Sequence, residues 1–351
     1  MSQRPNSSTT AQFEWDADER WLAAQEGIDA SSTSGRVVTY QSSHDPWLTS
    51  SYFVETELGV VLFDTQLFPA SALELRDRIC ERTDAPLHCV VITHAHPDHY
   101  WGNAIMREHT PGVPIVTSAG VDRELRANAE AHLDGTPSSW HDLTADSIVF
   151  PTIVFDGSAT LTFDDLTIEL FECGPAECES QVVGWIPEHE LLIAGDLVQN
   201  RLTYAVQDHW AGSWRRLLDD LRALRPRHVL TGHLGAAGPQ ILDESVAWFD
   251  AFLDEIGREL SPTHNPEQFG LLDERARAGV VAAMQSRFPD WWDSIMYDST
   301  ETILEWGLRV ATASPNDVVS LPHRSVPARL ATGKRPTPTL RDRRPGHEFQ
   351  R

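Results

Sequence analysis

The chain has 351 residues, of which 41% are hydrophobic and 23% are charged, a composition typical of a folded globular protein. Its formal net charge of −24 at pH 7 argues against a surface that attracts nucleic acid or anionic membranes. Four cysteines are too few for a disulfide framework, and no apolar stretch reaches the roughly 18 residues of a membrane helix. The N-terminus lacks the apolar run of a signal peptide, so we expect a cytoplasmic protein.

The two ends of the chain differ in composition from the middle. Residues 1–12 are rich in Ser, Thr and Gln, and we expect them to be disordered. Residues 326–351 combine Pro, Arg, Thr and Gly with few large apolar residues, which predicts a disordered basic tail. Between them we expect a main domain over residues 13–240 and a helical extension over residues 241–315.

The first half of the chain alternates strand patterns with helix patterns. In chain order we expect a hairpin of 51–54 and 60–63, a helix over 70–82, a buried strand over 87–92, a helix over 102–109, a strand over 113–116 and a helix over 121–133.

The second half begins with further hairpins and then becomes helical. We expect hairpins of 159–163 with 166–171 and of 182–186 with 191–194, a helix over 214–224, a strand over 228–231, and helices over 242–260, 271–288 and 299–311. Strands that alternate with helices twice over indicate two packed sheets with helices outside. The apolar stripe after Pro239 favours packing on its own domain, with a homodimer contact or a pocket cap as alternatives.

The strongest chemical signal follows the apolar run at 87–92. Three histidines and one aspartate lie within six residues there, at His94, His96, Asp98 and His99. Side chains alternate along a strand, so His94 and His96 can point the same way, and the proline after them supports a turn. Imidazole and carboxylate groups are ligands of Zn, Fe and Mn. The segment therefore predicts a metal site, against the alternative of a coincidental His-rich turn.

Two later apolar strands also end in residue types that bind metals. Residues 191–194 run into Gly195-Asp196, and residues 229–231 run into Gly232-His233. Each motif alone is weak, because an aspartate at a strand end is usually a turn or cap residue. Together with the histidine cluster they supply ligands from three strand ends, which a sheet fold can gather at one edge.

The order and spacing of these motifs resemble the metallo-β-lactamase superfamily of metallohydrolases over roughly residues 45–235. The H-x-H-x-D-H signature matches residues 94–99, and an Asp-Thr pair that ends an early strand in many members matches Asp64-Thr65. The bridging aspartate matches Asp196, and the final Gly-His matches Gly232-His233. The resemblance implies an α/β fold, an αββα sandwich of two mixed sheets with outer helices, here followed by the helical extension.

The resemblance also implies a ligand set for two metal ions. Site one consists of His94, His96 and a third ligand, and site two consists of Asp98, His99 and His233, with Asp196 bridging the two. We expect two divalent ions, zinc first, with manganese or iron(II) as alternatives.

The third ligand of site one is where this chain departs from the usual family pattern. The family usually has a histidine in a Gly-His-Thr-like turn, and here Glu177 stands in its place, 19 residues before Asp196. The alkylsulfatase branch is similar in using a glutamate, although it has a longer chain with an additional C-terminal domain. Cys178 and Glu179 are alternative donors, and a thiolate favours zinc.

The implied reaction is hydrolysis in which a metal-bound hydroxide attacks a carbonyl, sulfuryl or phosphoryl centre. Asp98 and Asp196 are the candidate catalytic residues, because either carboxylate can hold the proton of the nucleophile. The expected substrate is a small ester, lactone, thioester, amide or sulfate.

Aromatic residues near the motifs predict one wall of the substrate pocket. Tyr100 and Trp101 follow the histidine motif, and Asn200 and Tyr204 follow the bridging aspartate. An aromatic pocket in an acidic protein favours a neutral or hydrophobic small molecule over RNA, so no nucleic acid or membrane partner is expected.

Three other kinds of protein are alternatives to this hydrolase. A non-hydrolytic, iron-dependent oxygenase of the same fold would differ in metal content and in oxygen dependence. A non-catalytic binding protein is disfavoured because the ligand set is intact. A thioesterase or cyclase that acts on a carrier-bound chain is disfavoured because carrier proteins tend to be acidic, like this surface.

Overall fold

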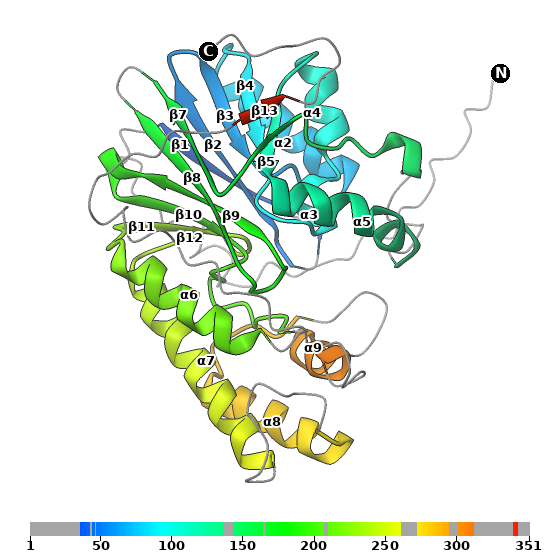
Figure 1. Cartoon of the computed structure of the whole chain (residues 1–351), viewed down its shortest axis with the longest axis vertical. Helices are drawn as coiled ribbons and strands as arrows, with labels where there is room; N and C mark the ends of the chain where they lie inside the picture. The colour runs from blue at the N-terminus through cyan, green and yellow to red at the C-terminus, as the bar shows by residue number, and fades with distance from the viewer. Residues whose placement is uncertain are drawn as a thin grey trace, which may run out of the picture.

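The structure is a computed structural model in which two β-sheets face each other and helices cover both outer faces (Figure 1). It describes residues 36–42, 44–45, 47–135, 143–163, 166–206, 210–260, 272–294, 301–311 and 340–342. This architecture confirms the predicted αββα sandwich and the helices that follow it.

The first sheet has the strand order β1-β2-β3-β4-β5-β6-β13. Its strands are β1 (Val37–Gln41), β2 (Ser50–Thr56), β3 (Gly59–Phe63), β4 (Leu87–Val91), β5 (Ile115–Ser118), β6 (Ile153–Phe155) and β13 (Leu340–Asp342). Strands β3 to β6 are parallel to one another, so their carboxyl ends lie at one edge. The outer helices of this sheet are α2 (Pro69–Arg82), α4 (Asn103–His109) and α5 (Ala119–Gly135).

The second sheet has the strand order β12-β11-β10-β9-β8-β7. Its strands are β7 (Ser158–Thr162), β8 (Thr167–Cys173), β9 (Gln181–Ile186), β10 (Leu191–Gly195), β11 (His228–Thr231) and β12 (Ala236–Ala237). Strands β7 to β10 form antiparallel hairpins, and β11 then runs parallel to β10 after helix α6 (Ala211–Ala223). The carboxyl ends of β10 and β11 therefore also lie at a common edge.

The main hydrophobic core lies between the two sheets and under the helices of the first sheet. Phe53, Leu62 and Val90 of the first sheet and Leu170 of the second are each fully buried in it. The run at β4 is buried along nearly its whole length, which explains why it is apolar rather than alternating.

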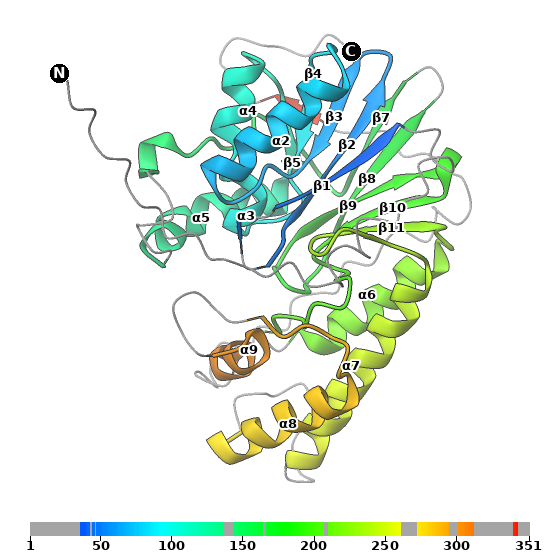
Figure 2. The same cartoon turned by 180° about the vertical axis from the view of Figure 1, so that it is seen from behind.

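A second core joins the sandwich to the helices that follow it. Helices α7 (Gln240–Glu259), α8 (Glu274–Arg287) and α9 (Ile303–Ala311) extend below the sandwich in both views (Figures 1 and 2). The apolar stripe of α7 is buried at Leu242, Val246, Phe249 and Ile256, because α7 packs on α6 and α8. The stripe is thus covered within the chain.

The predicted elements are present, and the unpredicted ones are short. Strand β13 lies inside residues 326–351, which the sequence predicted to be disordered, and it pairs antiparallel with β6. This corrects the prediction for three residues, whereas the rest of that segment and residues 1–12 lie outside the described part of the chain. Short strands such as β6 and β13 carry too few residues to show an alternating pattern.

Within the described residues, no helix combines the length and the apolar character that crossing a bilayer requires.

Candidate metal centre

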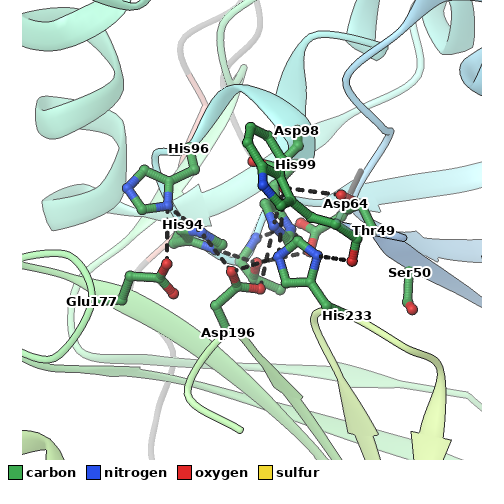
Figure 3. Close-up of polar contacts among 12 residues, drawn as sticks. Thr49, Ser50, Asp64, His94, His96, Asp98, His99, Glu177, Asp196 and His233 are labelled. Carbon is green, nitrogen blue, oxygen red and sulfur yellow. Dashed lines mark hydrogen bonds and ion pairs between the residues drawn. The ribbon is translucent and has the colours of Figure 1, made fainter. Parts of the chain in front are cut away.

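Eight potential ligands meet at the edge where strands from both sheets end: Cys178 and the seven residues predicted from the sequence, which Figure 3 labels. The segment after β4, including the short helix α3 (Pro97–Tyr100), contributes four of them, and loops after β8, β10 and β11 contribute the others. The ligands predicted from the sequence are therefore brought together: His94, His96, Asp98, His99, Glu177, Asp196 and His233.

The first group of donor atoms surrounds His94 and His96. His94 Nε2 lies 3.2 Å from His96 Nδ1, and His96 Nδ1 lies 3.5 Å from Glu177 Oε1. Asp196 Oδ2 lies 3.8 Å from His94 Nε2. These four residues offer donor atoms that all lie within 4.8 Å of one another, which is compatible with one ion.

The second group consists of Asp98, His99 and His233, and Asp196 also contacts it. His99 Nε2 lies 3.3 Å from both Asp98 Oδ2 and Asp196 Oδ1. His233 Nε2 lies 3.0 Å from Asp196 Oδ2 and 3.6 Å from Asp98 Oδ2. Asp196 thus stands between the two groups, as a bridging ligand must.

A layer of residues behind the ligands orients the imidazole rings. Asp64 Oδ2 lies 2.8 Å from His99 Nδ1, and the Thr93 hydroxyl donates to the same oxygen at 2.8 Å. The Thr93 hydroxyl is therefore left to accept from His94 Nδ1, which lies 3.0 Å away. Both rings then carry their proton on Nδ1 and present the Nε2 lone pair to the centre, as metal binding requires.

The β1–β2 connection orients the ligands of the second group. His233 Nδ1 donates to the carbonyl of Trp47 at 3.0 Å, so its Nε2 faces the centre. The Thr49 hydroxyl donates to Asp98 Oδ2 at 3.0 Å. Asp45 is fully buried and accepts the backbone N–H groups of Trp47 and Thr49, which holds this turn in place.

Three buried polar atoms of the centre make no hydrogen bond within the described part of the chain. They are His99 Nε2, Asp196 Oδ1 and Glu177 Oε2. Buried polar atoms almost always have a partner, and an atom without one costs on the order of 1–3 kcal/mol. All three atoms belong to potential ligands, so bound cations would satisfy them together. The residues present therefore fit a metal centre.

The charges of the centre also favour bound cations. Burial and the neighbouring Asp196 carboxylate raise the pKa of Glu177 well above its usual value. Burial alone would raise the pKa of Asp196, but His233, His99 and His94 outweigh it and hold that pKa well below its usual value. Two carboxylates this close are stable in ionised form only with a cation between them.

The orientation of His96 separates Glu177 from Cys178 as the third ligand of the first group. Glu177 Oε1 lies near His96 Nδ1, whereas Cys178 Sγ lies 3.5 Å from His96 Nε2, on the other side of the ring. His94 Nε2 also faces Nδ1, so an ion bound at Nδ1 would lie on the side of Glu177, whereas Cys178 forms a second possible group with His94 and His96. Cys178 is then positioned to orient the ring from behind. Glu179 faces outwards and pairs with Arg123.

Two side chains hold the loop that carries Glu177 by accepting hydrogen bonds from its backbone N–H groups. Glu124 of α5 accepts the N–H groups of Glu179 and Ser180, each at 3.2 Å. With its amide oxygen turned towards the loop, Gln181 accepts the N–H groups of Glu177 at 3.0 Å and Cys178 at 3.2 Å. Four successive N–H groups are thus fixed by two side chains. This arrangement positions the Glu177 carboxylate before any ligand binds.

The turn after β11 depends on a glycine. A Cβ at Gly232 would lie 1.6 Å from Asp196 Oδ1, so only glycine allows the chain after β11 to pass the Asp196 carboxylate this closely. Asp64, which supports His99, has a left-handed backbone with φ 61°. A non-glycine residue in this region is uncommon and is found where the surroundings enforce it, often at functional sites.

Three of the four predicted pocket residues lie in the core instead, which corrects that prediction. Tyr100 and Tyr204 are completely buried, and Trp101 is 5% exposed. Tyr100 and Trp101 belong to the main core, and Tyr204 packs against Trp214 and other rings of the second core. A side chain without accessible surface cannot line an open pocket.

The fourth predicted pocket residue, Asn200, is half-buried and connects two loops. Its side-chain amide donates to the carbonyl oxygen of Leu234 at 2.8 Å, so it ties the loop after Asp196 to the loop after His233. Sequence reasoning also missed Thr49, Asp45 and Glu124. Thr49 and Asp45 lie far from any motif, and the helix pattern of α5 marks Glu124 only as a partly exposed position.

Comparisons with known proteins agree with this fold. A sequence profile of the metallo-beta-lactamase superfamily matches residues 44–233, which is more than half of the chain. The chain therefore belongs to the metallo-beta-lactamase superfamily. Homologues in this superfamily support a metal-dependent hydrolase in general terms, although the family also includes non-hydrolytic members.

Individual relatives are distant. The metallo-beta-lactamase type 2 of Bacillus cereus is 23% identical over 171 residues, which is 48% of this chain and 59% of that protein. The chain therefore aligns with less than two thirds of that relative. A metallo-beta-lactamase family protein from Thermus thermophilus superposes with a TM-score of 0.52 at 18% identity, covering 73% of this chain and 94% of that one. A metallo-beta-lactamase from Pontibacter korlensis reaches a TM-score of 0.46 at 22% identity, covering 57% and 87%.

Proposed function

We propose that the chain is a hydrolase that uses two divalent cations, zinc in the first instance, to cleave an ester-like bond of a small molecule. One cation would be held by His94, His96 and Glu177, the other by Asp98, His99 and His233, with Asp196 between them.

The observation that carries this proposal is the set of buried donor atoms without hydrogen bonds. His99 Nε2, Asp196 Oδ1 and Glu177 Oε2 come from three separate segments, yet all face the same centre. The rings around them are held in the tautomer that binds a cation. His99 Nε2 and Asp196 Oδ1 lie 3.3 Å apart without forming a hydrogen bond, and Glu177 Oε2 also has no hydrogen-bond partner, so a cation between these groups would satisfy all three atoms.

Bound divalent cations would polarise the oxygen under attack and provide a hydroxide nucleophile near neutral pH. The protein's own residues then hold the nucleophile and its proton. Asp98 is fixed by the hydroxyl of Thr49 and has a neighbour on each side in His99 and His233. The Asp98 carboxylate can accept the proton of the nucleophile and hold it next to the reacting group. The Asp196 carboxylate could do the same.

Glu177 makes the centre less positive than a histidine would. Two divalent cations, three carboxylates and one hydroxide sum to a neutral centre, whereas a histidine at position 177 leaves one positive charge. A neutral centre accommodates harder ions such as manganese more readily. It also matches an uncharged substrate, for which the ester, lactone, thioester and amide classes are the candidates, with an alkyl sulfate as the charged alternative.

The test is elemental analysis of protein purified without added metal or chelator, with Glu177→Ala, Cys178→Ser and Glu179→Gln alongside. We expect about two equivalents of zinc or manganese in the wild type, falling towards one in Glu177→Ala and unchanged in Glu179→Gln. Cys178→Ser should keep both ions, because its sulfur lies behind His96. Hydrolysis of an ester, lactone and sulfate panel should require the bound metal.

A different metal result would change the proposal. About one equivalent of iron, unchanged in Glu177→Ala, together with oxygen consumption, would support the iron-dependent oxygenase instead. Loss of metal in Cys178→Ser but not in Glu177→Ala would move the third ligand to the thiolate.

A further inference from the structure

The C-terminal extension is connected by backbone hydrogen bonds to the loop that follows Asp196. Leu202 forms a parallel bridge with Trp292. Trp292 N donates to the carbonyl of Arg201 at 2.7 Å, and Thr203 N donates to the carbonyl of Trp292 at 2.9 Å. The position of Trp292 is therefore coupled to a loop that begins at a proposed metal ligand.

Helix α9 is fixed to the same region. Ile303 N donates to the carbonyl of Ser294 at 2.8 Å, and Leu304 N donates to the Asp293 carboxylate at 3.2 Å. A Cβ at Gly307 would lie only 3.1 Å from the backbone of Val206, so α9 lies directly on the loop after Asp196. Figures 1 and 2 both show α9 below the sandwich edge that carries α3.

The β1–β2 connection and the loop after His233 also lie next to the loop that follows Asp196. His233 Nδ1 donates to the carbonyl of Trp47, and Leu234, the next residue, donates its N–H to the carbonyl of Leu48 at 3.2 Å. Asn200 joins Leu234 to the loop after Asp196. Trp47 and Leu234 therefore adjoin a proposed ligand through the backbone itself.

Side chains from all these segments form one apolar cluster. Leu202 and Ile303 are buried at its centre, and Trp47, Leu234, Trp292 and Trp306 pack against them while remaining partly exposed. We call the last four residues the aromatic face. Its members come from the β1–β2 connection, the loop after His233 and the C-terminal extension, so the face exists only in the folded chain.

The neighbouring tryptophans belong to a different part of the molecule. Trp291 packs on the rings of Trp248 and Phe288 in the second core. Trp214 and Trp248 in that core are completely buried. Three partly exposed tryptophans thus gather in one cluster, and one of them, Trp47, accepts a hydrogen bond from His233 through its carbonyl. Apolar patches of this kind commonly mark a binding site.

We propose that the aromatic face binds the hydrophobic part of the substrate, an acyl chain or an aryl ring next to the bond that is cleaved. This inference rests on the proposed function for the position of the reacting bond and extends it to a substrate class. A hydrophobic group fits because the face offers large apolar rings on segments that adjoin the loops carrying His233 and Asp196, where the polar end would bind. The extension thereby contributes to specificity.

The experiment measures binding rather than turnover. Acetate, butanoate, hexanoate and octanoate are titrated by calorimetry into zinc-loaded wild type and into Trp292→Leu, Trp306→Leu and Trp291→Leu. Each carboxylate offers oxygen atoms to the metal centre, and only the chain length changes. We expect affinity in the wild type to rise about fourfold per buried methylene. Trp292→Leu and Trp306→Leu should lose about tenfold for octanoate and nothing for acetate.

Trp291→Leu is the matched control, because it removes the adjacent tryptophan from the second core. It should bind octanoate as the wild type does, and thermal unfolding of each variant shows that the fold is retained. Equal affinity for all four acids in the wild type would overturn the proposal, as would an equal loss in all three variants. If the wild type hydrolyses no ester but prefers octanoate, only the proposed function fails. If the wild type hydrolyses esters at rates that do not depend on chain length, only the proposal for the aromatic face is wrong.

Discussion

The nitrogen of His96 that faces the centre decides which neighbouring donor can share a cation with it. Nδ1 faces His94 and Glu177, whereas Nε2 faces Cys178. The two nitrogens of one imidazole point in different directions, so one ion cannot bind Nδ1 and also take Cys178 as its ligand. The direction of this one ring therefore favours Glu177 among the alternatives at residues 177–179, and the metal content of the Glu177→Ala and Cys178→Ser variants tests that preference.

The identity of residue 177 should set the pH at which hydrolysis begins. Glu177→His removes one negative charge from the centre, so bound water should lose its proton more easily. We expect the acidic limb of the pH–rate profile to shift to lower pH while metal content is retained. An unchanged acidic limb in fully loaded protein would contradict the charge argument.

Glu124 should make stability depend on pH. Burial, partly offset by the N–H groups of Glu179 and Ser180, raises its pKa from 4.5 to about 7. The folded state therefore binds this proton more tightly than the unfolded state, and its stabilising effect is lost as pH rises from 4.5 to about 7. Urea unfolding of wild type and Glu124→Gln at pH 5 and pH 8 tests this.

The metal ligands titrate equally in the wild type and in Glu124→Gln, so their effect cancels when the unfolding free energies of the two proteins are subtracted. We expect the stability of the wild type relative to Glu124→Gln to fall by about 2 kcal/mol between the two pH values. A difference that does not change with pH would show that Glu124 is ionised throughout.

At the scale of elements, the site depends on where parallel strands end. Strands β4, β10 and β11 end at one edge, and each is followed directly by ligands. These strands were predictable because each is a continuous apolar run, buried on both faces. Strands β6, β12 and β13 were not predicted, because they have only two or three residues. Strand β1 was missed because its sequence VVTYQ is not a continuous apolar run and does not alternate.

The turn after β11 should tolerate no side chain. We expect Gly232→Ala to displace Asp196 and to lose bound metal, because the new methyl group overlaps Oδ1. Gly135→Ala is the matched control, since nothing lies within 4 Å of a Cβ at the end of α5. Elemental analysis should show metal in the control and a deficit in Gly232→Ala. Full metal content in both would mean that β11 can move aside.

At the scale of the molecule, the centre joins the two sheets. His94, His96 and His99 belong to the first sheet's loops, and Glu177, Asp196 and His233 to the second sheet's (Figure 3). Bound cations should therefore stabilise the sandwich as a whole, by the free energy of metal binding to the native state.

Removal of metal should lower the melting temperature. We expect a chelator to lower Tm of the wild type by about 5 °C or more, corresponding to roughly 3 kcal/mol of linkage. Asp196→Ala, which lacks the residue shared by both groups, should respond much less. Calorimetric scans with and without chelator provide the measurement. An identical Tm for metal-free and loaded wild type would show that the cations do not hold the sheets together.

The fold class and six of the potential ligands could be predicted from the sequence alone, whereas Glu177 was one of three candidates there. That information is local, because apolar runs define the strands and each ligand follows its strand within a few residues. Such local patterns can be recognised in the sequence without knowing how distant parts of the chain pack.

The surroundings of those ligands could be known only from the folded structure. The hydrogen bond from His233 to Trp47 joins residues 186 positions apart, and Thr49 reaches Asp98 across 49 positions. The aromatic face likewise unites Trp47 with Trp292. No periodic pattern records such contacts, because they follow from how the two sheets and the extension pack. The orientation of the ligands and the residues that select a substrate are therefore properties of the folded chain.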